Sequence, residues 1–164
     1  MAEGPANVRR ASSEDWRGLR SIRLESLHDT PEAYGSTHAE SVTWTDERWR
    51  AAAARWTYFL AERDDRVVGM VSGGANDHHP GTRWLYAMYV TPPERATGTA
   101  ARLVEAVGEW AQAEGVCQVY LHVTSSVARA RAFYEKMGFV PTGDTITMDR
   151  DPSITLLTMV LELD

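Results

Sequence analysis

The feature that most constrains the fold is a strand, helix, strand pattern between residues 84 and 123. Residues 84–90 read Trp-Leu-Tyr-Ala-Met-Tyr-Val, apolar or aromatic on both alternating faces, which is typical of a strand covered on both sides. Pro92 and Pro93 end it, because proline cannot donate to a strand ladder. Apolar residues at helical spacing predict a helix over 98–114, which Gly115 stops. With a buried strand at 118–123, the pattern predicts a βαβ unit in a mixed α/β fold.

The remaining elements complete a single domain over residues 1–164, a length that buries enough surface for a hydrophobic core. No internal repeat, low-complexity stretch or linker divides it. Ser12 and Asp15 have the spacing of a capping box at a helix start. The segment 73–81, rich in Gly, His and Pro, is expected to be a loop. The other predicted elements are strands at 8–11, 58–62, 66–72, 145–148 and 154–163, and helices at 12–27, 45–55 and 127–137.

The composition limits the cellular compartment and the classes of partner that are expected. Cys117 is the only cysteine, which leaves no disulfide and no thiol cluster for zinc and favours a reducing, cytoplasmic setting. The first ten residues have no apolar run of signal-peptide length, and no segment has the roughly 18 apolar residues of a membrane span. The net charge of −6 argues against a nucleic-acid partner, which would need clustered Lys and Arg. It weakly favours a cationic substrate.

The helix that begins at Gly98 predicts an anion site. Backbone N–H groups at a helix N-terminus have no intrahelical partner and attract a phosphate. Gly98 lets the main chain approach a pyrophosphate, and the side chains from Thr97 to Ala101 are small. A nucleotide-binding P-loop or Rossmann site is excluded, since neither Gly-Lys-Ser/Thr nor Gly-x-Gly-x-x-Gly is present. A helix that merely begins with small residues remains an equal alternative for this motif alone.

Two motifs together resemble the GNAT superfamily of N-acetyltransferases. Tyr89-Val90-Thr91-Pro92 leads into Arg95-x-x-Gly98-x-Ala100, and Phe133-Tyr134-Glu135-Lys136-x-Gly138-Phe139 follows at the spacing found in that family. The specific likeness covers residues 84–143. It implies a mixed, mostly antiparallel sheet of about six or seven strands flanked by about four helices, with one splayed parallel strand pair.

The resemblance also implies where acetyl-CoA would bind. The pantetheine arm would enter between the splayed strands, and the pyrophosphate would lie on the loop with Arg95 at its edge. Tyr134 would hydrogen-bond the sulfur and protonate the departing thiolate; a purely structural core aromatic is the alternative. Val127 replaces an asparagine that many members have, so Ser125 or Ser126 is a candidate substitute. The donor-binding residues expected are Met88, Tyr89, Val90, Arg95, Ala96, Thr97, Gly98, Thr99, Ala100, Ala101, Ser126 and Tyr134.

The base and the acceptor site are less constrained. His122 takes the place of a glutamate found in ribosomal-protein alanine acetyltransferases, and its ordinary pKa near 6.5 suits a base at neutral pH. A structural histidine is equally compatible with that position. His78 and His79 are expected to be exposed, and no metal site is predicted. Residues that follow the first helix are candidates for recognising the amine: Glu32, Tyr34, His38 and Glu40, with Trp44 and Trp49 as further lining or as core anchors.

The sequence therefore predicts an acetyl-CoA-dependent N-acetyltransferase. The acceptor is expected to be a primary amine of a small molecule that attacks the thioester directly in a ternary complex. A protein or peptide acceptor, a catalytically silent acyl-CoA-binding module, and a propionyl or succinyl donor are the alternatives. A homodimer is compatible with the family, whereas neither a membrane nor a nucleic acid is expected as a partner.

Overall fold

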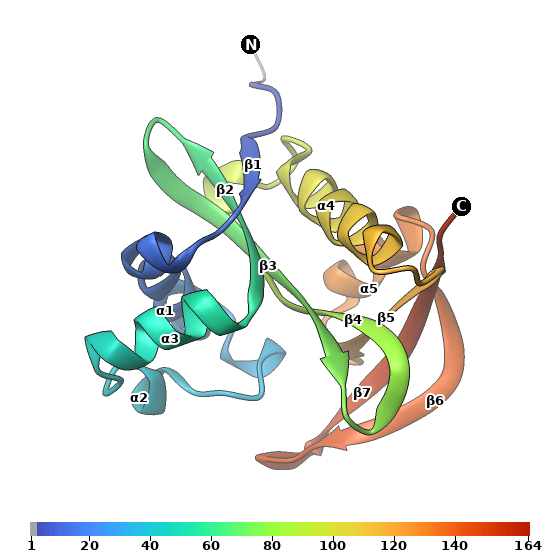
Figure 1. The fold of residues 1–164 in the computed structure, drawn as a ribbon. Coiled ribbons are helices and arrows are strands. Elements are labelled where there is room, and N and C mark those ends of the chain that lie inside the picture. The colour runs from blue at the N-terminus through green and yellow to red at the C-terminus, as the bar shows by residue number, and fades with distance from the viewer. Residues whose placement is uncertain (1–2) are drawn as a thin grey trace.

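The computed structural model describes residues 3–164, which form one mixed sheet with helices on both faces (Figure 1). The strand order is β1-β2-β3-β4-β5-β7-β6, and every neighbouring pair is antiparallel except β4 and β5. The predicted mixed sheet with one parallel pair is confirmed. The strands are β1 (Asn7–Arg10), β2 (Thr57–Arg63), β3 (Arg66–Asn76), β4 (His79–Val90), β5 (Gln118–Thr124), β6 (Val140–Met148) and β7 (Asp151–Glu162). The helices are α1 (Trp16–Asp29), α2 (His38–Ser41), α3 (Asp46–Arg55), α4 (Thr99–Ala113) and α5 (Ala128–Lys136).

Two hydrophobic cores lie on opposite faces of the sheet. Helices α1 and α3 cover one face, where Leu19 and Trp49 pack against Leu60 and Met70 of the central strands. Helices α4 and α5 cover the other (Figure 1), with the apolar stripe of α4 facing inward as its spacing predicts. No helix within residues 3–164 is both long enough and apolar enough to cross a membrane.

Side-chain caps explain where the helices on the first face begin. The Ser12 side chain accepts a hydrogen bond from Glu14, and the Asp15 carboxylate accepts one from the Ser12 N–H at 2.7 Å. The capping box precedes a 3₁₀ turn, so α1 itself starts at Trp16. Thr45 caps α3 by accepting from the Arg48 N–H at 3.2 Å.

The expectation of a loop over 73–81 is wrong, because β3 and β4 continue through it as a hairpin. Gly74 pairs with Trp84 and Asn76 with His79. The Asn76 side chain accepts a hydrogen bond from the His78 N–H at 2.9 Å, which stabilises the turn. Gly73 is needed inside the strand because the Trp110 ring of α4 covers it. Strands β6 and β7 are also longer than predicted, and the short helix α2 was not predicted.

Strands β4 and β5 pair only briefly before they separate. Their register contains only Arg83 with Val119 and Trp84 with Tyr120. Beyond Trp84, β4 has a bulge: three steps along β4, from Tyr86 to Tyr89, face two along β3. Ala87, within the bulge, has φ of 53°, a left-handed conformation that is uncommon for a residue other than glycine. The predicted splayed pair is therefore present, and its separation begins just before the bulge.

Replacing Gly73 with alanine tests the packing of α4 on the hairpin. An added Cβ would lie 2.6 Å from Trp110 Cζ3, so the ring must move, and we expect a loss of about 1–3 kcal/mol in the free energy of unfolding. At the neighbouring Gly74 the nearest atom is 3.5 Å away, on Tyr86, so Gly74→Ala is the control. Equal denaturation midpoints for the two variants would contradict this account of the hairpin.

Candidate functional site

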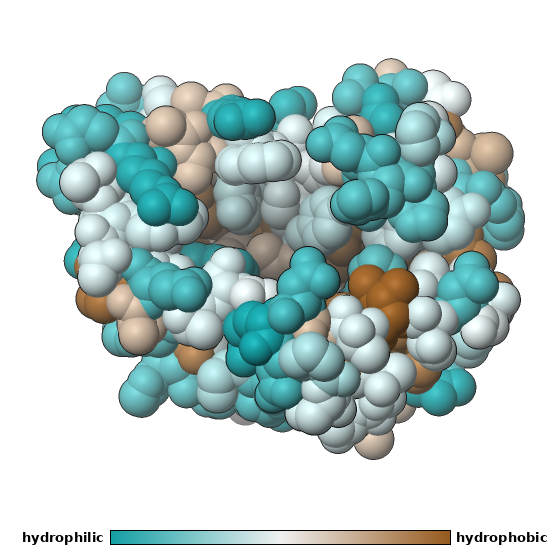
Figure 2. All heavy atoms as spheres, turned by 90° about the horizontal axis from the view of Figure 1, so that it is seen from below, coloured by the Kyte–Doolittle hydropathy of each residue, from teal (hydrophilic) through white to brown (hydrophobic). Residues whose placement is uncertain are grey.

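A cavity of about 690 Å³ opens where β4 and β5 separate. Its lining comes from both strands, from α1 and α5, from the segment after α1, and from the β6–β7 hairpin. Figure 2 shows this lower face of the molecule hollowed near its centre, with a largely hydrophilic rim. The fold thus provides an open cleft at the point where the parallel strands lose their pairing.

Tyr134 projects from α5 into this cavity. Its ring is 7% exposed and packs edge-on against Phe133 and Phe139, with ring centroids 5.3 and 5.6 Å apart. Gly138, with φ of 103°, ends α5 and lets the chain turn so that Phe139 reaches this position. Burial raises the pKa of the Tyr134 phenol well above its ordinary value. The hydroxyl therefore remains protonated at neutral pH and can act as a hydrogen-bond donor.

Tyr34 lines the same cavity from the opposite side. Its hydroxyl donates a hydrogen bond to the main-chain oxygen of Met88, at 2.8 Å. Burial raises the pKa of Tyr34 to about 12. Tyr34 was expected to contact the acceptor, and Met88 the donor; this hydrogen bond brings the two residues together beside the β4 bulge.

His122 lies half-buried on β5 with its ring at the cavity wall. The ring packs against Trp84, with centroids 4.6 Å apart, and Tyr120 stacks on the same indole. Burial lowers the pKa of His122, and His79 adds to the effect. The imidazole is therefore neutral at pH 7 and able to accept a proton.

The loop before α4 presents backbone rather than side chains. Ala96 and Gly98 have φ of 68° and 93°, so the chain turns sharply before the helix begins at Thr99. The Thr99 hydroxyl faces inward, where it accepts a hydrogen bond from the Ala6 N–H at 2.9 Å. The Thr97 hydroxyl donates to the Glu94 main-chain oxygen at 2.6 Å. The Thr99 N–H makes a long hydrogen bond of 3.4 Å to the Thr97 hydroxyl, so the N–H groups of Ala100 and Ala101 in the first turn of α4 are the ones most available to bind an anion.

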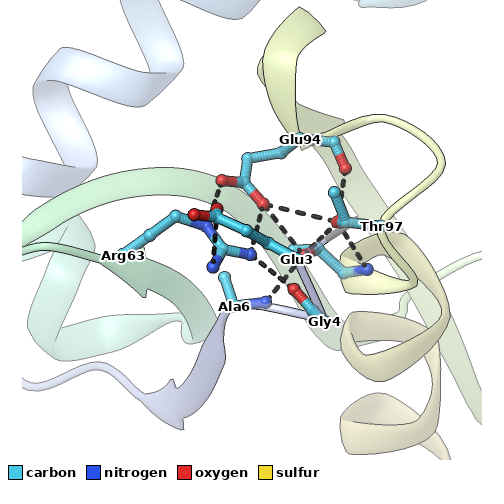
Figure 3. Close-up of polar contacts among 7 residues, drawn as sticks. Glu3, Gly4, Ala6, Arg63, Glu94 and Thr97 are labelled. Atoms are coloured by element: carbon cyan, nitrogen blue, oxygen red, sulfur yellow. Dashed lines mark hydrogen bonds and ion pairs between the residues drawn. The ribbon is translucent and has the colours of Figure 1, made fainter. Parts of the chain in front are cut away.

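The buried carboxylate of Glu94 holds the loop before α4 in place (Figure 3). Glu94 is 6% exposed, and Arg63 of β2 donates to its two carboxylate oxygens at 2.5 and 3.1 Å. The Thr97 and Thr99 hydroxyls lie 3.4 and 3.3 Å from the same carboxylate. Arg63 also donates to the main-chain oxygen of Gly4 at 2.6 Å, which fastens the N-terminal segment beside the loop. The hydrogen bond from Arg63 lowers the pKa of Glu94.

Arg95 lies at the edge of the loop, as expected. It forms an ion pair with Asp29 of α1 at 2.8 Å and lies over the Tyr89 ring, 5.9 Å from its centroid. Its guanidinium therefore joins the loop to α1 in this structure.

Outside the loop before α4 and the first turn of that helix, six predicted site residues do not line the cavity, and two of them, Tyr89 and Val90, are buried in the cores on opposite faces of the sheet. Glu32, Glu40 and Ser126 are exposed, and His38 is partly buried against His28. Glu40 borders a second, shallower hollow of about 390 Å³, together with Trp44. Trp49 is a core residue. The binding roles of Glu32, His38, Glu40 and Ser126 stay predictions, as does the absence of a metal.

Two cavity residues that the sequence did not single out have buried polar atoms without a partner. Within residues 3–164, three such side-chain atoms occur: Arg23 Nη1, Thr124 Oγ1 and Trp49 Nε1. Arg23 and Thr124 both line the cavity. Because buried polar groups are normally hydrogen-bonded, these atoms indicate a site built for a polar ligand. A helix arginine and a strand-end threonine give no local signal of this role.

Replacing Glu94 with glutamine tests the buried support of the loop. The variant keeps the side-chain size but removes the charge that Arg63 binds, so we expect lower stability at pH 7. Because the folded-state pKa of Glu94 is depressed, its contribution is present above the unfolded pKa and is lost as pH falls through the folded value. The difference from the parent should shrink below roughly pH 4 in urea denaturation. Glu105→Gln, in an exposed pair with Arg102, is the control; a pH-independent difference would contradict this account.

Part of this chain is similar in sequence to known acetyltransferases. The chain is 33% identical to human N-acetyltransferase 8 over 92 residues, which are 54% of this chain. It is 32% identical to the mycothiol acetyltransferase of Kocuria rhizophila over 105 residues, which are 61% of this chain. The chain spans only 40% and 32% of the lengths of these two relatives.

Solved structures share the fold over nearly the whole chain. An N-acetyltransferase from Staphylococcus aureus Mu50 superposes with a TM-score of 0.73 at 22% identity, over 98% of this chain and 100% of that one. The yncA protein of Salmonella typhimurium, solved with its cofactor acetyl-CoA, gives 0.76 at 19% identity, over 98% and 95%. The model of the acetyltransferase (GNAT) family matches residues 19–139, most of the chain. The protein belongs to the acetyltransferase (GNAT) family.

Proposed function

We propose that the protein transfers the acetyl group of acetyl-CoA to a primary amine of a small molecule. The observation that carries this proposal is that one cavity holds side chains suited to the acetyl transfer and is walled by the strand that precedes the candidate phosphate site. Tyr134 and His122 face it from α5 and β5, and the chain runs from β4 in the cavity wall through residues 91–98 to the N–H groups at the start of α4. Family membership supports the same reaction.

The residues present fit acetyl-CoA. The pyrophosphate would be held by backbone N–H groups from Ala96 to Ala101, whose loop is braced by Glu94. The pantetheine arm would lie along Met88, Tyr89 and Val90, where β4 has no partner on the β5 side. The Met88 main-chain oxygen accepts from Tyr34, and the other backbone groups on this open strand edge need hydrogen-bond partners when buried, which an amide-containing arm supplies. The Thr124 hydroxyl, buried without a partner among residues 3–164, is a further group available to the arm, besides Ser125 or Ser126.

The reaction joins the acceptor nitrogen to the acetyl carbon while the carbon–sulfur bond breaks. The ammonium form of the acceptor must first lose a proton, which neutral His122 can accept directly or through water. The leaving sulfur must gain a proton, which the Tyr134 hydroxyl can donate, and the second proton that the nitrogen releases as the amide forms restores that hydroxyl. Cys117, the only cysteine, does not line the cavity, which supports direct attack over a cysteine-bound acetyl group.

A small acceptor fits a cavity whose wall is held together at the β6–β7 turn. Arg150, at the β6–β7 turn, donates to the main-chain oxygens of Pro31 and Tyr34 at 2.6 and 2.8 Å. This contact ties the turn to the segment after α1, and both form part of the cavity wall. A protein N-terminus remains the alternative acceptor, and a binding-only module the alternative function. Release of free CoA from acetyl-CoA with a panel of amines separates the enzyme from the binding-only module.

The substitution Tyr134→Phe tests the role of the phenol. It removes only the buried hydroxyl, so we expect kcat for the best amine to fall about 100-fold or more, while the Kd for acetyl-CoA stays within a few-fold. Steady-state assays and calorimetry measure the two quantities. Tyr120→Phe is the control, because that hydroxyl bonds Gln118 outside the cavity. An unchanged kcat would remove Tyr134 from this role.

The pH dependence of kcat/KM tests His122. A depressed pKa places the acidic limb below about pH 6.5, with activity rising as pH rises through it. His122→Gln should abolish that limb and lower the plateau about 100-fold. His79→Gln should shift the limb to higher pH, because His79 helps to lower the pKa of His122. If the limb survives unchanged in His122→Gln, another group is the base.

A further inference from the structure

Arg23 is a cation of the cavity wall that the proposed chemistry does not use. It lies on α1, lines the cavity, and has a buried Nη1 without a hydrogen-bond partner among residues 3–164. Two other half-buried arginines have carboxylate partners: Arg63 pairs with Glu94 and Arg95 with Asp29. Among the arginines of residues 3–164, Arg23 is the one with a buried side-chain nitrogen that has no partner.

A buried guanidinium nitrogen without a hydrogen-bond partner lowers the stability of the folded protein. A guanidinium stays charged at any pH that a folded protein meets, so it cannot avoid the cost of burial by losing its proton. The Tyr34 ring offers partial compensation, since the Arg23 guanidinium carbon lies 5.1 Å from its centroid. A ring face satisfies no N–H donor, however. A planar oxyanion would satisfy two at once.

The charges around the cavity favour an anion, in contrast to the acidic chain as a whole. The charged side chains in its wall are Arg23, Arg150 and Asp149, and His122 is neutral at pH 7. Arg150 is already bound to main-chain oxygens of Pro31 and Tyr34. The expectation of a cationic substrate from the net charge of −6 thus does not describe the cavity itself.

Tyr34 sets the distance between Arg23 and the reacting centre. The guanidinium lies over the ring of Tyr34, while the hydroxyl of the same side chain bonds the Met88 main-chain oxygen beside the strand gap. A ligand bound to Arg23 is therefore about one tyrosine side chain from the gap. Aromatic groups of Trp56, Tyr58 and Tyr86 also line the cavity and suit an apolar portion of the ligand.

We propose that the acceptor is an amino acid, whose carboxylate is bound by Arg23 and whose amine is thereby directed to the strand gap. This inference rests on the proposed function and assigns Arg23 as the specificity-determining residue of that site. A carboxylate a few bonds from the reacting amine matches the short separation that Tyr34 imposes.

Matched acid and amide pairs test this inference in the parent protein. The twenty standard amino acids and their C-terminal amides, which keep the amine but lose the negative charge, are assayed for CoA release at saturating acetyl-CoA. We expect at least one acid to be preferred over its amide by roughly 10- to 100-fold in kcat/KM, the range expected for a charge-assisted hydrogen bond. Arg23→Gln should erase that preference, and Arg23→Lys should restore part of it. The KM for acetyl-CoA should be unchanged in both.

Arg20→Gln is the control, since it removes the same charge from α1 at a position outside the cavity wall. Calorimetric titration of the same acids and amides into the CoA-saturated protein gives a readout independent of turnover. If acids bind in preference to amides but no amine is acetylated, the proposed function fails and the role of Arg23 stands. Equal use or binding of acids and amides, no binding of any amino acid, or equal losses for both classes in Arg23→Gln would overturn the inference.

Discussion

The separation of β4 from β5 beyond Trp84 is the constraint on which the rest of the structure depends. Two strands that remained paired to their ends would leave no room between them and no free backbone edge. The bulge at Ala87 accompanies this separation, at the energetic cost of a left-handed alanine. It also changes which side chains face each core: Leu85 packs with α4 and so does Val90, whereas Tyr89 packs with α1.

The gap is lined by side chains that come from distant parts of the chain. Tyr134 enters from α5 and Tyr34 from the segment after α1, and burial keeps both phenols protonated. Two of the three buried side-chain atoms without partners within residues 3–164, on Arg23 of α1 and Thr124 of β5, belong to residues that line this cavity. A pantetheine arm along β4 would give the Thr124 hydroxyl a hydrogen-bond partner, and an acceptor carboxylate near α1 would give Arg23 one. The polar groups left unpaired in the free protein are thus the basis of the proposed specificity.

Local sequence signals predicted the parts of the fold in which local and tertiary preferences agree. The apolar stripe of α4, its start after Gly98 and the capping box at Ser12 are of this kind. The β3–β4 hairpin was missed because glycine normally interrupts a strand, whereas Gly73 makes room for Trp110. The bulge could not be predicted from the sequence. Because β4 is apolar on both faces, reversing which residues face each side does not change its hydrophobic pattern. Arg23 could not be identified from sequence, because its role depends on what the fold places around it.

Hydrogen exchange measured by mass spectrometry, with and without saturating acetyl-CoA, tests the central claim most directly. If the donor lies in the strand gap and on the α4 loop, exchange should slow in peptides that cover residues 86–90, 96–102 and 121–127. It should be unchanged in α3 and around the second hollow beside Trp44. Protection of the second hollow without protection of 86–90 and 96–102, or no protection anywhere, would contradict the account.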